Sequence, residues 1–119
     1  MMKYNYAYIK LFFAIEHMTT ARGSRKEQLL AVYQSYLHVL NESDFPDSVK
    51  VTWQYFKENI SNKGAPDGYD PENKQGRVYW TIRQMGWQKT EKMTQALWDL
   101  YKALSEETHT WRLSESESN

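Results

Sequence analysis

The stretch that decides the fold is KYNYAYIKLFFAIEHMTT, residues 3–20. Its large apolar side chains recur at the spacing of one helical face, i, i+4, i+7, i+8 and i+11: Tyr4, Tyr8, Leu11, Phe12 and Ile15. Tyr6, Ile9 and Phe13 add apolar surface to the remaining faces. Because a helix that is apolar all round is normally central to a core or covered by a partner subunit, we expect this first helix to be largely buried. A homodimer through the first helix is the alternative to a central position.

The residues that follow predict a tight turn into a second helix. Gly23 can adopt the left-handed backbone that stops a helix. Ser24 and Glu27 have the spacing of a capping box, in which both side chains satisfy backbone N–H groups at a helix start. The second helix is therefore expected to run from Ser24 to about Asn41. Its apolar stripe consists of Leu29, Tyr33, Tyr36, Leu37 and Leu40.

Three more helices complete the predicted fold. The third is expected over about 44–61, with Pro46 in its first turn, where no backbone N–H is needed. A shorter helix is expected over 76–85 and the last over about 88–106. The apolar stripe of the last helix consists of Met93, Leu97, Leu100 and Leu104, flanked by Ala96 and Tyr101. Between the third and fourth helices, residues 62–75 form a long loop, because their glycines and prolines are typical of turns. Loops of this length are uncommon within a compact domain and are usually functional or disordered.

These elements predict an all-α protein, a compact bundle of four to five helices with one long loop at about 62–75. A chain of 119 residues fits one domain, and we assign residues 1–113 to it. The remaining tail, 114–119, alternates Ser and Glu and is expected to be disordered.

The charge and cysteine content exclude several classes of protein. Lys+Arg and Asp+Glu both number 15, so no global electrostatic attraction to nucleic acid or anionic lipid is expected. Because there is no cysteine, disulfides and thiolate-based metal or catalytic sites are excluded. No stretch approaches the roughly 18 apolar residues of a membrane span, and the N-terminal stretch lacks the clean apolar segment of a signal peptide. We therefore expect a soluble, cytoplasmic protein that does not associate with membranes.

No catalytic or metal-binding motif occurs in the sequence. His17, His38 and His109 are far apart, and none has the spacing of a zinc motif. The acidic residues of the long loop, interrupted by Pro71, fail the alternating pattern of a calcium loop. Phosphate-binding glycine patterns and nucleophile elbows are also missing. The sequence thus predicts a protein that is not an enzyme and needs no cofactor or metal.

One constellation of aromatic and basic residues is a candidate binding site. It comprises Tyr69, Arg77, Trp80, Arg83, Trp87 and Lys89. If one helix carried Trp80, Arg83 and Trp87, their i, i+3, i+7 spacing would place the arginine between two indoles on one face. Arginine stacks on indole rings, and both residue types are frequent at binding hot spots. The alternative is that both tryptophans cover the core and Arg83 shields them.

Two functions fit this constellation. The first is a non-catalytic protein-interaction module, such as an inhibitor, an adaptor or a small subunit of a larger assembly, which binds a protein partner through the aromatic and basic face. The second is a nucleic-acid-binding protein that uses residues 77–89, because bases stack on aromatic rings while cations hold phosphates. The pattern of helix, Gly86 and helix also raises a helix-turn-helix, but the second helix carries mixed rather than basic charge. We favour the first function.

Overall fold

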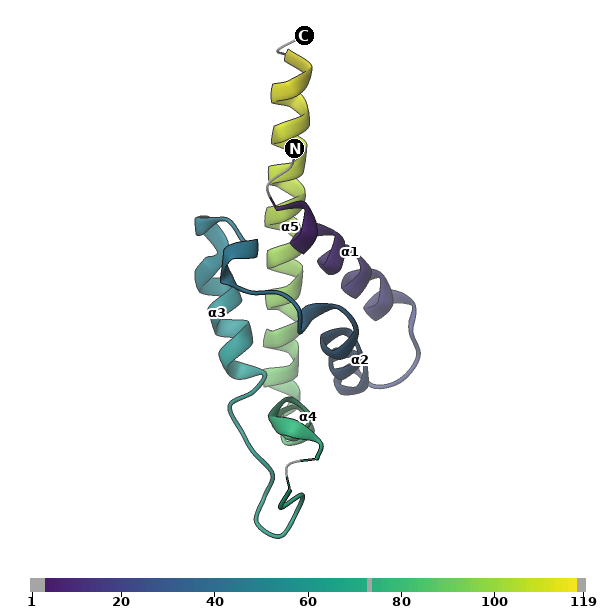
Figure 1. The fold of residues 1–119 in the computed structure, drawn as a ribbon. Coiled ribbons are helices and arrows are strands. Elements are labelled where there is room, and N and C mark those ends of the chain that lie inside the picture. Colours follow the sequence, from purple (N-terminus) through teal and green to yellow (C-terminus); the bar gives the residue numbers. More distant parts are fainter. Residues whose placement is uncertain (1–3, 73, 118–119) are drawn as a thin grey trace.

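The computed structural model describes residues 4–72 and 74–117, with side chains as far as residue 107. Within these residues the regular structure is helical and contains no strand, which confirms the predicted all-α class. Five α-helices form the fold (Figure 1): α1 Asn5–Thr20, α2 Arg25–Val32, α3 Lys50–Asn59, α4 Gly76–Arg83 and α5 Trp87–Glu117. The shorter elements are a π-helical segment, Tyr33–Leu37, and two 3-10 turns, Glu42–Asp44 and Asp47–Val49.

Helix α5 forms the centre of the molecule. Helices α1 and α3 pack on opposite sides of it, and α2 and α4 lie near its first turns (Figure 1). Its inward face is a buried stripe made of Met93, Ala96, Leu97, Leu100 and Leu104. This is the stripe that the sequence predicts for the last helix. The expectation of a central first helix is wrong, because the longest helix occupies that place.

Helix α1 packs on the core through a narrow face. The buried residues on it are Ala7, Leu11, Ala14, Ile15 and Met18. The larger side chains between them are 41–49% exposed: Tyr6, Ile9, Phe12 and Phe13. Within one copy of the chain, Phe12 and the other large side chains between the buried residues are therefore not covered by the core. The homodimer alternative, which would cover them, stays a prediction. The side chains that face the core are two alanines and the aliphatic Leu11, Ile15 and Met18, and the rings of this helix lie on its outer side.

The turn between α1 and α2 has the predicted start of a helix. Gly23 has a φ of 106°, in the left-handed region that glycine adopts without steric cost. The Ser24 hydroxyl accepts a hydrogen bond from the backbone N–H of Glu27 at 3.2 Å, which confirms the serine half of the predicted capping box. The Glu27 carboxylate does not bind the Ser24 N–H, so the reciprocal half does not form. Gln28, which no sequence signal singles out, is buried and donates from its amide to the Ala21 carbonyl at 2.9 Å. Two polar side chains therefore fix this turn.

The second helix is not one continuous α-helix to Asn41. Helix α2 ends at Val32, and in the π-helical segment the His38 N–H donates to the Tyr33 carbonyl at 3.0 Å. A π turn contains more residues than an α turn, so it shifts the phase of the side chains that follow. The shift brings Leu37 to the face that Val32 occupies, and both are buried. Leu29, Leu37 and Leu40 of the predicted stripe are buried as expected, but a single helical periodicity gives no signal for the π turn between them.

Helix α5 continues past the expected end at residue 106, as far as Glu117, and extends beyond the other helices in Figure 1. The side chains of residues 108–119 and the backbone of residues 118–119 lie outside the described residues. The disordered tail at 114–119 and the domain boundary at 113 therefore stay predictions. None of the helices in the described part of the chain combines the length and apolarity needed to cross a lipid bilayer.

Candidate functional site

The loop between α3 and α4 begins in contact with α4. The Lys63 backbone N–H donates to the Thr81 hydroxyl at 2.9 Å, and this hydroxyl donates to the Lys63 carbonyl at 2.8 Å. One residue further, the Gly64 carbonyl accepts a hydrogen bond from the Gln84 amide at 2.8 Å. These bonds anchor the start of a segment that its composition predicts to lack regular structure.

Asp70 organises the second half of the loop. Its carboxylate accepts hydrogen bonds from the backbone N–H groups of Lys74 at 2.5 Å and of Gln75 at 2.8 Å. It also accepts the indole N–H of Trp80, on α4, at 2.8 Å. These donors, the indole first, hold the pKa of the Asp70 carboxyl below its usual value. The φ of Asp70 is 45°, a left-handed conformation that aspartate adopts more readily than most residues.

Two of the candidate residues, Tyr69 and Trp80, therefore pack the loop onto α4. Their rings meet edge to face with centroids 6.0 Å apart. The Trp80 ring also meets the Tyr79 ring edge to face at 5.0 Å. The Arg83 guanidinium lies 5.9 Å from the centroid of Tyr79. The arginine thus contacts a tyrosine ring of its own helix, and the half-buried Trp80 fixes the loop.

The candidates Arg77 and Lys89 both turn toward α3. The Arg77 guanidinium donates through Nε to the carbonyl of Ser61, just past the end of α3, at 2.9 Å. The Lys89 ammonium donates to the side-chain carbonyl of Asn59 and lies 5.8 Å from the ring centroid of Tyr55. Neither cation joins Arg83 on a common surface.

Trp87 stands apart from the other candidates. It is the first residue of α5, and 75% of it is exposed. The predicted face with Arg83 between Trp80 and Trp87 does not form, because α4 ends at Arg83 and the chain turns before α5 begins. The i, i+3, i+7 spacing describes one continuous helix, and the turn at 84–86 interrupts it.

Two grooves meet where α2 and α5 begin and α4 ends. One measures about 420 Å³ and lies between α2 and α4, with Arg83 and Tyr79 in its wall. The other measures about 380 Å³ and has Trp87 in its wall. Ser24 and Lys26 line both grooves. We call the surface formed by Ser24, Lys26, Arg83 and Trp87 the α2–α4–α5 corner.

Lys26 is a residue of the corner that the sequence pattern does not single out. Its ammonium donates to the Arg83 carbonyl at 3.2 Å, across 57 positions of the chain. This bond satisfies a free carbonyl in the last turn of α4 and places a cation where the helix dipole favours one. No local motif encodes a contact between segments so distant in the sequence. Only the packing of α2 on α4 reveals it.

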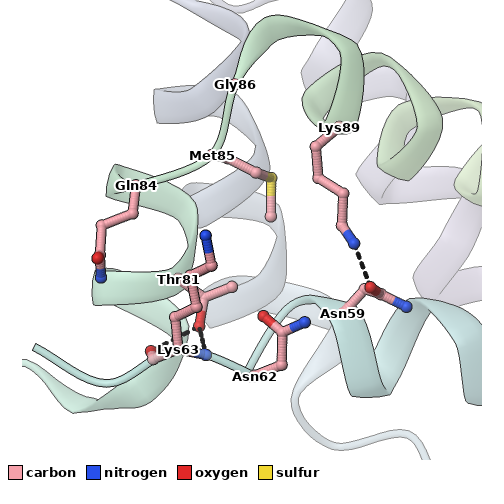
Figure 2. Close-up of a pocket in the computed structure, with 8 residues that line it drawn as sticks. All are labelled: Asn59, Asn62, Lys63, Thr81, Gln84, Met85, Gly86 and Lys89. Atoms are coloured by element: carbon pink, nitrogen blue, oxygen red, sulfur yellow. Dashed lines mark hydrogen bonds between the residues drawn. The ribbon is translucent and has the colours of Figure 1, made fainter.

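A smaller pocket of about 160 Å³ lies where the loop meets the turn between α4 and α5 (Figure 2). Most of its lining is polar: Asn59, Asn62, Lys63, Thr81, Gln84 and Lys89. Figure 2 shows that Lys89 is bonded to Asn59, and that Thr81 is bonded to the backbone of Lys63. Because the polar groups of Thr81, Gln84 and Lys89 are bonded to the loop and to the end of α3, the pocket belongs to the anchoring of the loop, and we assign it no ligand.

Aromatic side chains of α1 and α5 form a second surface. Trp98 meets Tyr101 edge to face with centroids 6.2 Å apart, and Tyr101 lies 6.4 Å from the Phe12 ring. Phe12 meets Phe13 at 5.8 Å. Phe13 in turn stacks on Tyr36 at 6.0 Å. The rings are therefore continuous across two helices. Tyr6 and Ile9 are exposed on the same side of α1 as Phe13. We call the exposed apolar residues of this surface the aromatic face, and it consists of Tyr6, Ile9, Phe12, Phe13 and Trp98.

Both surfaces are open rather than enclosed. Among the residues whose side chains are described, no group of three or more His, Cys, Asp or Glu could hold a metal ion. Comparison of the chain with protein-family models, with curated proteins and with solved structures gives no match in any of the three.

Proposed function

We propose that this chain is a non-catalytic protein-interaction module, an inhibitor, an adaptor or a small subunit of a larger assembly, that binds a protein partner at the α2–α4–α5 corner. The observation that supports this function is the exposure of Trp87 beside two open grooves. Tryptophan is among the most frequent hot-spot residues, because covering its large ring removes much apolar area from water. We also propose that the protein is cytoplasmic, because a chain without cysteine suits this reducing compartment.

The charges at the corner favour a partner that combines an apolar and an acidic side chain. The two grooves have three cations in their walls, Arg25, Lys26 and Arg83, against two carboxylates, Glu27 and Glu91. Arg83 makes no salt bridge with any described residue, so its guanidinium can pair with a carboxylate of the partner. An apolar neighbour of that carboxylate would then cover the indole.

This arrangement favours protein binding over nucleic-acid binding. A protein that binds a single strand uses a basic groove with aromatic rings along it. Arg77 and Lys89 are instead turned toward α3, and Arg83 lies over Tyr79. The cations of residues 77–89 therefore share no single surface.

Affinity capture tests the proposal. The tagged chain, Arg83→Ala and Trp87→Ala are used to capture proteins from the lysate of the native host. Val51→Ala is the matched control, since Val51 is an exposed apolar residue on α3. We expect one set of proteins to bind the wild type and the control and to be lost from both corner variants, while the melting temperature stays unaltered. If both variants still capture these proteins, the partner does not bind at the corner. Capture of nucleic acid with a steep salt dependence would instead support nucleic-acid binding.

A further inference from the structure

The aromatic face suggests an interaction that is independent of the corner. We infer that this face is where the chain associates with a second copy of itself, α1 packing antiparallel on α1 about a two-fold axis. The four α1 residues of the face lie on the side of the helix opposite its buried stripe. Helix α1 lies at the outside of the molecule (Figure 1), so a second copy can reach it.

The area of the aromatic face fits the apolar centre of a dimer interface. An aromatic side chain carries roughly 150–250 Å², so exposed fractions of 38–49% on the four aromatic residues leave about 350 Å². Ile9, which is 41% exposed, raises the total to about 400 Å². A stable interface buries about 800 Å² on each partner, and about two-thirds of a homodimer interface is apolar. The aromatic face therefore supplies most of the apolar area that one copy has to contribute.

Phe12 and Phe13 of the aromatic face are held in place before a partner binds. Phe12 contacts Tyr101, which itself stacks on Tyr8 at 5.9 Å between centroids. Phe13 stacks on Tyr36 of the π-helical segment. Side chains that are already ordered lose little conformational entropy on association. A larger part of the free energy gained by burying apolar area therefore contributes to the affinity.

The outermost side chains of α1 are complementary to themselves. Tyr6, Ile9, Phe13 and Glu16 follow spacings of three, four and three residues, a pattern that is the same in both directions. In an antiparallel pair Ile9 lies opposite Phe13 of the second copy. Tyr6 lies opposite Glu16, so its hydroxyl can donate a hydrogen bond to that carboxylate. A two-fold interface requires this reciprocity, which an unrelated partner would not.

Sedimentation analysis of the full chain measures self-association directly. We expect a dimer of about 28 kDa, twice the 14.2 kDa of the chain. Phe13→Asp should raise the dimer Kd by at least about tenfold, because it places a carboxylate in the apolar centre. Ile9→Asp, one turn earlier, is a second variant in case Phe13→Asp fails to fold. Val51→Asp is the control, because it adds the same charge to α3 and should leave the dimer intact. Circular dichroism and the melting temperature of each variant show whether its fold is intact.

A double-mutant cycle tests the antiparallel register. Tyr6→Phe removes the donor of the expected hydrogen bond, and Glu16→Ala removes its acceptor. Each variant should raise the dimer Kd by about three- to tenfold. The double variant should raise the Kd no further than the larger single effect, because both changes remove the same bond.

Three results would overturn the inference or its register. If the wild type stays monomeric at every concentration, the aromatic face does not mediate self-association, and a different protein would have to cover it. A dimer that survives Phe13→Asp and Ile9→Asp would use another surface of the chain. Effects of Tyr6→Phe and Glu16→Ala that multiply in the double variant would exclude the antiparallel pairing. The corner variants Arg83→Ala and Trp87→Ala should dimerise like the wild type whatever they do to partner binding.

Discussion

At the scale of single residues, Asp70 holds the second half of the loop on α4 through one carboxylate. Its three donors are two backbone N–H groups of the loop and the indole of Trp80. An ionised carboxylate accepts such bonds more strongly than a protonated one. The charge state of Asp70 therefore controls how firmly the loop is attached.

Acid should release the loop. A carboxyl group with a lowered pKa in the folded state contributes stability above its unfolded pKa, here the ordinary 3.8, and loses it as the pH falls through the lower folded pKa. Asp70→Asn should therefore reduce the free energy of unfolding by an amount that is constant above pH 3.8 and shrinks below it. Thermal melts of both proteins from neutral to strongly acid pH measure this difference. A difference that persists undiminished in strong acid would show that the carboxylate is not responsible.

Gln28 should stabilise the turn between α1 and α2. Its amide donates to the carbonyls of Ala21 and Gly23, and its own carbonyl accepts from the Arg25 guanidinium. Gln28→Ala leaves two acceptors without this donor, so it should reduce the free energy of unfolding by about 1–3 kcal/mol. Gln34→Ala, at an exposed position of the π-helical segment, should change it by less than about 0.5 kcal/mol. Urea unfolding compares the two, and equal losses would disprove the role of Gln28.

At the scale of elements, apolar periodicity predicts that each α-helix exists, but it does not determine which face turns inward. The stripe of the last helix is buried as expected, because α5 is regular and central. On α1 the face that carries Leu11, Ile15 and Met18 packs on the core and Phe12 stays exposed, although the large rings and the aliphatic side chains fit the same helical periodicity. After Val32 the π turn changes the phase, and the sequence has no local signal for it.

The π-helical segment should tolerate the loss of one residue. Because a π turn holds one residue more than an α turn, deleting the exposed Ser35 should leave Val32 and Leu37 on the buried face. Deleting the exposed Gln95 should rotate the rest of α5 by about 100° and destroy the core. We expect a cooperative thermal melt for the first deletion and none for the second. The explanation of the π turn fails if the Ser35 deletion unfolds the protein as well.

At the scale of the whole molecule, the corner depends on helices that are far apart in the sequence. Residue type alone singles out Arg83 and Trp87 as candidates. Lys26 joins them only because α2 packs on α4. Trp80 is not part of the corner, because its indole N–H is bound to the Asp70 carboxylate in the loop. The part of the site that the sequence could not predict is therefore the part that arises from tertiary contacts.

Trp87 at the corner and Trp53 in the core should differ in how much they contribute to the free energy of unfolding. Trp53 is buried and stacks on Phe45 and Phe56, so Trp53→Ala should reduce the free energy of unfolding by about 3–5 kcal/mol. Trp87→Ala should change it by less than about 0.5 kcal/mol, because the side chain is mostly in water. Urea unfolding measures both values. A large loss for Trp87→Ala would mean that this side chain supports the fold.

Site-specific photo-crosslinking in the native host tests most directly whether a protein partner binds at the corner. A photoreactive phenylalanine analogue is placed at position 87 in the corner, at position 13 in the aromatic face, and at position 51 on α3 as the control. We predict that position 87 yields adducts with other proteins and that position 51 does not. Position 13 should yield an adduct of about 28 kDa, twice the 14.2 kDa of the chain. Adducts of position 87 that contain only nucleic acid, or that position 51 forms equally well, would contradict a protein-binding corner.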